Sequence, residues 1–389
     1  MPYLDNSATT PLATEVAAEM ALWRERSFAN ASSVHRGGQE ARVRLEDARE
    51  HIAAALGAEP KEIIFTSGGT EANNHALKGY ALKIRSATGR WPAIIIPRNE
   101  HHAVLHPAEF LESLGAPVRY IDVDAEGRVT TGALRSALMA VEPEPPPLVS
   151  IMHANNETGT INPIQELAHI AHEAGAVFHT DAVQTFGKLR FTAAELGADM
   201  LSISAHKIHG PKGIGALYVH KDVELEPLMH GGAQERNRRG GTEAVELVAG
   251  LDKAVTLAMS GLEENTAKMA ELGGSLRGLL AGIEGVRFVT PSAGALPNIV
   301  NVTFEDAARL DGEGLIIGMD LMGVAVSNGS ACTSGSIQPS HVLSAMGLPP
   351  EQARGAVRFS LSRYTTPEDI ERGATALRQV LARMRGVSS

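Results

Sequence analysis

One segment decides how the rest of the chain is interpreted: Ser202-Ile203-Ser204-Ala205-His206-Lys207-Ile208-His209-Gly210-Pro211-Lys212-Gly213-Ile214-Gly215. A strand pattern at 198–204 leads into it, and its glycines and proline predict a tight turn before a strand pattern resumes at 216–219. Lys207 is therefore expected on a loop at a strand end. Burial and the neighbouring cation His206 would lower the pKa of its ammonium group and free a nucleophilic amine, as a Schiff-base lysine requires. A single lysine on a loop is more often simply solvated. The other motifs therefore have to decide whether Lys207 is a Schiff-base lysine or a solvated one.

Strand and helix patterns alternate along the first two thirds of the chain. Short apolar runs predict strands at 62–66, 93–96, 118–121, 148–152 and 176–180. Segments with helical period precede them or lie between them, at 15–24, 39–56, 71–84, 104–114, 133–141 and 164–174. Continuous rather than alternating hydrophobicity indicates strands that are buried on both faces, and therefore an α/β fold with a mostly parallel sheet between helices.

The pattern changes after Gly241. A long helix-favouring tract at 243–280, broken only by glycines, leads into a second domain. Strands are predicted there at 286–289, 299–304 and 356–361, and helices at 315–322 and 367–384.

Composition limits the classes of function. The chain of 389 residues has 43% hydrophobic residues and a net charge of -10, with no basic stripe, which argues against nucleic acid or an anionic membrane as the main partner. The N-terminus lacks the pattern of a signal peptide, and no apolar run approaches the roughly 20 residues that span a bilayer. The single cysteine, Cys332, excludes an internal disulfide and suits a reducing compartment, so a cytoplasmic protein is expected.

A glycine-containing turn joins the first predicted strand to the next helix, Thr66-Ser67-Gly68-Gly69-Thr70-Glu71. Its amides, the Thr70 hydroxyl and the helix N-terminus would face one point and bind a phosphate. The alternative is that Thr70 only caps the helix. The turn is not a Walker loop, because no Gly-Lys-Ser/Thr follows it.

Asp181 follows the strand at 176–180, within His179-Thr180-Asp181-Ala182-Val183-Gln184. The carboxyl ends of strands in open α/β sheets gather ligands. If the cofactor is pyridoxal phosphate, an aspartate here would keep the ring nitrogen protonated and the ring an electron sink. A helix N-cap is an equally weighted alternative for Asp181.

Histidines follow the strand at 93–96, in Asn99-Glu100-His101-His102-Ala103-Val104. An imidazole at this edge could stack on a planar cofactor and transfer protons. Five histidines, His101, His102, His106, His206 and His209, could also be imagined as a metal site. We discount one, because there is no His-Glu-x-x-His pattern and no convincing carboxylate partner.

Cys332 lies in a tract of small residues, 327–336. Lone cysteines are most often buried and inert. A Gly/Ser/Asn run cannot pack a core, however, so we expect an exposed thiol on a mobile tether that takes up a group at the active site and delivers it elsewhere.

Together these motifs resemble those of the cysteine desulfurases of the NifS/IscS type, within the class V, fold type I aminotransferases. The resemblance runs from Asp5-Asn6-Ser7-Ala8-Thr9-Thr10 to Arg358-Phe359-Ser360-Leu361-Ser362-Arg363. Its most specific parts are Ser204-Ala205-His206-Lys207 with Gly210-Pro211-Lys212-Gly213, the pair Glu100-His101, and Gly329-Ser330-Ala331-Cys332.

The resemblance implies a pyridoxal-phosphate transferase of fold type I. A large domain, 14–257, would hold a mostly parallel seven-stranded sheet and the cofactor. A smaller α+β domain, 1–13 and 258–389, would carry the mobile cysteine loop at about 327–340.

Roles for single residues also follow from the resemblance. Lys207 would form the Schiff base, Asp181 would pair with the ring nitrogen, Gln184 would donate to the phenolic oxygen, and His101 would stack on the ring. The phosphate would be held by Gly69, Thr70, Ser204, His206 and, from a second subunit, Thr242. Asn155 and Arg358 would orient the substrate carboxylate, for which a guanidinium fork is well suited, although Arg358 could instead face solvent.

The implied activity is removal of sulfur from L-cysteine, which gives L-alanine and a persulfide on Cys332. An acceptor protein, such as an iron-sulfur cluster scaffold, would then take the sulfur from a homodimeric enzyme. One alternative is a selenocysteine or cystine lyase in which Cys332 is dispensable. Another is a partner-binding protein that has lost turnover, although the presence of Lys207, Asp181 and His101 argues against it.

Overall fold

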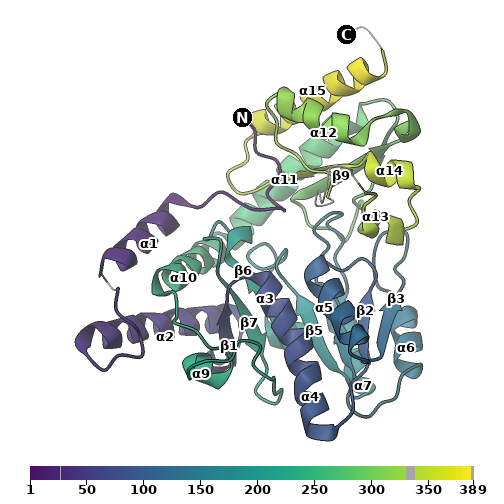
Figure 1. Cartoon of the computed structure of the whole chain (residues 1–389). Helices are drawn as coiled ribbons and strands as arrows, with labels where there is room; N and C mark the ends of the chain where they lie inside the picture. Colours follow the sequence, from purple (N-terminus) through teal and green to yellow (C-terminus); the bar gives the residue numbers. More distant parts are fainter. Residues whose placement is uncertain (27, 330–337, 387–389) are drawn as a thin grey trace.

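The computed structural model describes residues 1–26, 28–329 and 338–386 (Figure 1). Its larger sheet has seven strands in the order β1-β7-β6-β5-β4-β2-β3. The strands are β1 (Ile63–Thr66), β2 (Ile94–Pro97), β3 (Val118–Ile121), β4 (Leu148–Ser150), β5 (Val177–Asp181), β6 (Met200–Ser204) and β7 (Gly215–Val219). Only β7 runs antiparallel to its neighbours β1 and β6, so the predicted α/β fold with a mostly parallel sheet is confirmed.

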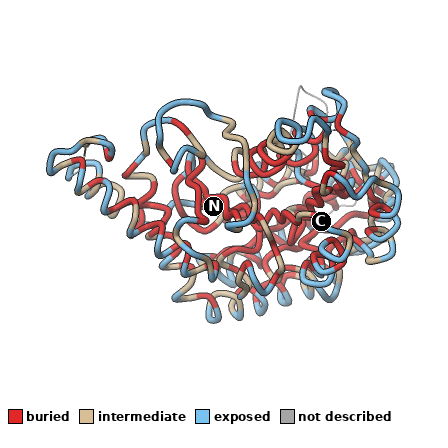
Figure 2. The backbone as a smooth tube through the Cα atoms, turned by 90° about the horizontal axis from the view of Figure 1, so that it is seen from below, coloured by how far each residue is buried: buried red, intermediate tan, exposed pale blue. Residues whose placement is uncertain are grey.

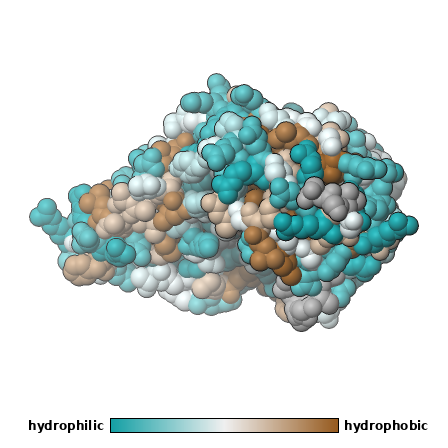
Figure 3. Space-filling model, turned by 90° about the horizontal axis from the view of Figure 1, so that it is seen from above, coloured by the Kyte–Doolittle hydropathy of each residue, from teal (hydrophilic) through white to brown (hydrophobic). Residues whose placement is uncertain are grey.

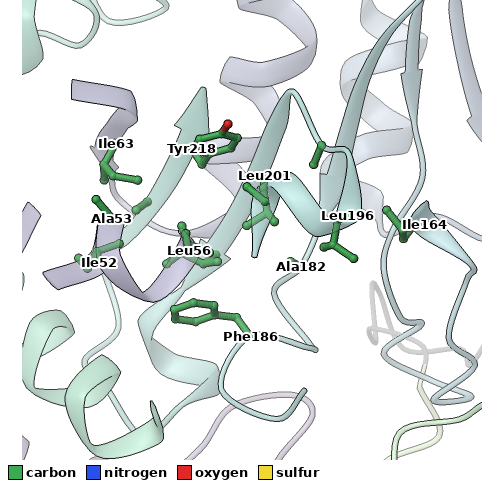
Figure 4. Close-up of a cluster of buried hydrophobic side chains, with 14 of the residues drawn as sticks. Ile52, Ala53, Leu56, Ile63, Ile164, Ala182, Phe186, Leu196, Leu201 and Tyr218 are labelled. Atoms are coloured by element: carbon green, nitrogen blue, oxygen red, sulfur yellow. The ribbon is translucent and has the colours of Figure 1, made fainter. Parts of the chain in front are cut away.

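Helices cover both faces of this sheet (Figure 1). One face packs against α2 (Arg36–Leu56), α7 (Ile164–Glu173) and α10 (Val245–Ser260), with α1 (Thr14–Arg26) against α10. Figure 4 shows part of this core, where Leu56, Phe186 and Leu201 come together. The other face packs against α3 (Gly69–Asn74), α4 (Tyr80–Thr88) and α5 (His102–Ser113). Burial on both faces explains why the strands read as continuous apolar runs.

Several predicted elements differ in extent from the observed ones. The helix expected at 71–84 consists of α3, a π-helical turn at His75–Gly79 and α4. The tract at 243–280 divides at Gly261 into α10 and α11 (Leu262–Ala281), while its other glycines lie inside these helices. Shorter helices are α6 (Thr131–Met139), α8 (Ala193–Leu196) and α9 (Gln234–Asn237).

A second sheet has three antiparallel strands, β8 (Val286–Phe288), β9 (Ile299–Phe304) and β10 (Val357–Ser360), in the order β10-β9-β8. Its core includes side chains from α11, α12 (Gly312–Leu321) and α15 (Pro367–Met384), and also Leu4 from the N-terminal segment. Two short helices, α13 (His341–Ala345) and α14 (Pro350–Arg354), complete this half. Because Leu4 packs with this core, we retain as a proposal the division into 14–257 and 1–13 with 258–389.

The N-terminal segment connects the two halves. Asp5 forms a bridge with Ser360 of β10, and the amide of Thr10 donates to the carbonyl of His206 just after β6. The buried residues of this segment are Pro2, Leu4, Asn6, Ser7, Thr10 and Ala13. Figure 2 shows in red how much of the backbone is buried near the centre of the molecule. None of the described helices combines the length and the apolarity needed to cross a membrane.

Candidate active site

A cavity of about 610 Å³ lies at the carboxyl ends of β5 and β6. Its walls come from the loop after β1, the start of α5, the N-terminal segment and Arg358 of β10. The strand register brings the wall residues together, because Thr66 and Ser204 both lie opposite Gly215. A side chain at Gly215 would approach the Cα of Gly68 to 2.8 Å, so a glycine is needed for the loop to pack there.

Lys207 reaches the cavity from the 3-10 turn Ala205–Lys207, directly after β6. Its Nζ donates to the carbonyl oxygens of Ser7 and Ala8, the latter at 2.7 Å. Burial and two cations, Arg358 and Lys188, lower the pKa of Lys207 to about 7, from 10.5. The amine is therefore substantially neutral near neutral pH.

The predicted source of this effect was partly wrong. Burial and neighbouring cations lower the pKa of His206 to about 4, so its imidazole is neutral near pH 7 and is not a cation beside Lys207. The cations that act on Lys207 come from other elements of the fold, and the sequence pattern around the lysine does not reveal them. His206 does line the cavity, with its Nδ1 3.1 Å from the Thr9 hydroxyl.

Asp181 is the last residue of β5, and both oxygens of its carboxylate have partners. Oδ1 accepts from the amide of Val183 at 2.9 Å, and Oδ2 accepts from Nδ2 of Asn73 at 2.6 Å. The residues after Asp181 form turns, so the alternative of a helix N-cap is wrong. Sequence reasoning missed Asn73, although it lies one helical turn after Thr70 and hence on the same face of its helix.

The turn after β1 has the shape of an anion site. Gly68, with φ 146°, is the N-cap of α3, so the alternative that Thr70 caps this helix is wrong. No side chain caps the helix, which leaves its first amides free for a ligand. The hydroxyl of Ser204, which also lines the cavity, is buried and has no hydrogen-bond partner.

His101 and Gln184 complete this side of the cavity. His101 is the N-cap of α5, and its Nδ1 accepts from the amide of Ala103 at 3.0 Å, which fixes the ring. Gln184 is buried; its Nε2 donates to the Ser7 carbonyl at 3.0 Å, while its Oε1 has no partner.

Arg358 enters the cavity from the smaller sheet. Its side chain is only 3% exposed, so the alternative of a solvent-facing position is wrong. One terminal nitrogen pairs with Asp5 at 2.7 Å and the other donates to the carbonyl of Asn156 at 2.9 Å, while Nε has no partner.

Comparison with known proteins gives a consistent result. The family model for aminotransferase class-V matches residues 2–372. The chain belongs to the class-V aminotransferase family. It is 48% identical over 387 residues to "Cysteine desulfurase IscS" of Dictyoglomus turgidum, covering 99% of this chain and 96% of that protein.

Two solved structures are also similar. One is described as a NifS-like protein, with a TM-score of 0.89 and 36% identity over 98% of this chain and 99% of that one. The other is described as SspA in complex with cysteine, with a TM-score of 0.81 and 38% identity over 94% of this chain and all of that one (100%). The resemblance stated from sequence motifs is confirmed.

The class-V fold does not bring every predicted residue to the cavity. Asn155 does not line it: its Nδ2 donates to the carbonyl of Asn99, and its Oδ1 accepts from the amides of Glu157 and Thr158, so it shapes the turn that presents Asn156. Thr242 is exposed and lies outside the lining. Cys332 lies outside the described residues. Among the residues that are described, no three His, Cys, Asp or Glu side chains form a group that could hold a metal ion.

Sequence reasoning gave no role to Ser7, Ala8 and Thr9, which also line the cavity. The carbonyls of Ser7 and Ala8 accept from Lys207. These contacts join residues about 200 positions apart, and backbone acceptors leave no mark in a sequence.

Proposed function

We propose that this protein is a cysteine desulfurase that uses pyridoxal phosphate. It removes the sulfur of L-cysteine, releases L-alanine and leaves the sulfur on Cys332 as a persulfide. One observation carries the proposal: Lys207 and Asp181 face one cavity from neighbouring strand ends, in a chain 48% identical to a cysteine desulfurase.

The cavity residues fit this cofactor. An anion at the Gly68 turn would meet the free amides of α3 and the unpartnered hydroxyl of Ser204. We assign the phosphate to Gly69, Thr70, Ser204 and His206, the ring nitrogen to Asp181, the phenolic oxygen to Gln184 and the ring face to His101. When bound, pyridoxal phosphate supplies an electron sink for the charge that develops at the substrate Cα.

The chain's own residues bind the substrate and move its protons. Arg358 has an unpartnered Nε and pairs with the substrate carboxylate. The neutral amine of Lys207 removes the Cα proton, since its lowered pKa of about 7 leaves it a usable base at neutral pH. Asn73 and the Val183 amide hold the Asp181 carboxylate in a fixed orientation.

Sulfur transfer needs one nucleophile, and Cys332 is the only cysteine. Its thiolate attacks the sulfur of the substrate, so that a sulfur–sulfur bond forms as the carbon–sulfur bond breaks. The electron pair of the broken bond stays with the carbon fragment, which takes up a proton and leaves as alanine. Transfer of the outer sulfur to an acceptor restores the Cys332 thiolate. Because a free thiol persists best in a reducing compartment, we place the enzyme in the cytoplasm.

The proposal includes a homodimer and a sulfur acceptor. Thr242 is exposed and outside its own cavity, which suits a residue that binds the phosphate of a second subunit. Apolar residues are exposed in and around α1 and α2, toward the left end of the face in Figure 3; they include Leu22, Phe28, Val34 and Val43. Such a surface suits association with another chain.

An iron-sulfur cluster scaffold is the acceptor we propose.

Mass spectrometry of the protein after brief incubation with L-cysteine tests the proposal, with alanine measured in parallel. We expect one added sulfur atom on Cys332, matched by alanine, and neither in the Lys207→Ala variant. Alanine or pyruvate with free sulfide, an unmodified Cys332 and full activity of Cys332→Ala would instead identify a lyase.

A further inference from the structure

A second, small cavity adjoins Lys207. Its volume is about 30 Å³, the space of roughly one water molecule. Polar and cationic side chains line much of it, including Asn6, Lys188, His209 and Arg363. No carboxylate lines it, so the cationic side chains are not neutralised there.

Lys188 is the most deeply buried of these cations, at 8% exposure. Its Nζ donates to the carbonyl of Gln184 at 2.8 Å, and among the described residues no carboxylate lies within ion-pair distance. Its backbone is fixed as well, because its amide donates to Thr185 and its carbonyl accepts from the Thr266 hydroxyl. A buried ammonium without a counter-ion is costly, and burial lowers the pKa of Lys188 to about 8.

A short chain of contacts connects Lys188 to Lys207. Lys188 donates to the backbone of Gln184, whose side chain donates to the Ser7 carbonyl, and that carbonyl also accepts from Lys207. The two lysines also share the small cavity. These hydrogen bonds hold both lysines beside a cavity that has room for about one water molecule.

Other charges also act on Lys207: the cation Arg358 lowers its pKa more strongly than Lys188 does, and the carboxylates of Asp181 and Asp5 raise it. Arg358 pairs with Asp5 at 2.7 Å, while Asp181 is the remaining anion that faces Lys207. At the small cavity, Arg363 is a further cation, whereas the pKa of His209 is lowered to about 4, so its imidazole is neutral near pH 7. Among the described residues, Lys188 is the buried positive charge near Lys207 that has no carboxylate partner. Arg363 and Lys212 also form no ion pair there, but both are more exposed than Lys188.

We propose that Lys188 is a positioning residue whose buried positive charge keeps the nitrogen of Lys207 unprotonated near neutral pH. Two ammonium groups in a site with little water repel each other, so the charge on one favours the neutral form of the other. This inference rests on the proposed function, in which Lys207 has to be a neutral base and nucleophile.

The test is a visible-absorbance pH titration of the purified enzyme with pyridoxal phosphate bound through Lys207. It compares the unaltered protein with Lys188→Met, which keeps the shape without the charge, and Lys188→Arg, which keeps the charge. Lys188→Gln is measured beside them in case Met is not tolerated. Lys83→Met is the matched control, because it removes a lysine charge from the outer side of α4, where Lys83 pairs with Glu224.

We expect the titration midpoint of Lys188→Met to move to higher pH by roughly one unit, the scale of a nearby charge in a site shielded from water. Lys188→Arg and Lys83→Met should titrate like the unaltered protein. An unmoved midpoint in folded Lys188→Met or Lys188→Gln would overturn the inference, as would an equal shift in Lys188→Arg, which would indicate packing. If the unaltered protein developed no cofactor band, the proposed function would fail and the inference with it.

Discussion

The two sides of the main cavity are built differently. Lys207 and Asp181 stand at the carboxyl ends of β6 and β5, which pair directly in the large sheet; we call them the sheet side. Arg358 comes from β10 of the small sheet and is held by Asp5 of the N-terminal segment; we call this pair the junction side.

This difference separates two tasks. Strand ends in a buried sheet hold their side chains rigidly, which suits groups that move protons and electrons. The junction side presents the guanidinium of Arg358, with its fork geometry and an unpartnered Nε, which suits recognition of a carboxylate. We therefore expect changes on the sheet side to lower kcat and changes on the junction side to raise KM.

Lys207→Ala should give the largest effect. Removing the amine abolishes both the attachment to the cofactor and the proposed proton transfer, so alanine formation from L-cysteine should fall by about 10³-fold or more. The fold should survive, because a buried lysine is replaced by a smaller apolar residue; circular dichroism checks this. A folded variant that kept more than a tenth of the activity would contradict the assignment of the proton-transfer chemistry to the sheet side.

Asp181→Asn should rank second. The amide keeps the shape but loses the charge that, in the proposed function, holds the ring nitrogen of the cofactor protonated, so kcat should fall by about 10²-fold with little change in KM. Steady-state kinetics measure both constants, with Asp222→Asn, an exposed residue, as the control. An effect confined to KM would assign Asp181 to substrate binding instead.

Arg358→Lys should act on binding alone. The ammonium keeps the charge but not the bidentate geometry, so KM for L-cysteine should rise about tenfold while kcat changes little. Arg287→Lys makes the same exchange at an exposed position of β8 and should leave both constants unchanged. A large loss of kcat in Arg358→Lys would mean that the two sides are not separable.

The smallest predicted effect is the pH dependence of kcat, which tests whether proton transfer belongs to the sheet side alone. The pKa of Lys207 in the folded protein is lowered to about 7, so its amine is neutral above that pH and protonates below it. Turnover should therefore fall about tenfold for each pH unit below this point and level off above it. Arg358→Lys retains a positive charge and should retain the same acid limb, whereas a limb that moved with it would tie the junction side to proton transfer.

The local pattern of the chain was sufficient to place the sheet side. The strands before Lys207, Asp181 and His101 were predicted as apolar runs followed by polar residues, and in a mostly parallel sheet such ends meet at one edge. Roles for Arg358 and Gln184 came from family resemblance, and the structure brings both residues to the cavity. Asn155 was expected in the cavity, but its Oδ1 accepts from amides of the following turn and its Nδ2 donates to the carbonyl of Asn99.

The sequence by itself determined the fold class, the family and the order of the site residues, because these depend on hydrophobic period, turn residues and short motifs. Only the tertiary structure decided which charges act on Lys207. Arg358 and Lys188 lower its pKa, the predicted His206 does not, and the carbonyls of Ser7 and Ala8 hold its amine. Electrostatic interactions and backbone contacts depend on distance and burial, and distance in space is not encoded in the spacing of residues along a chain.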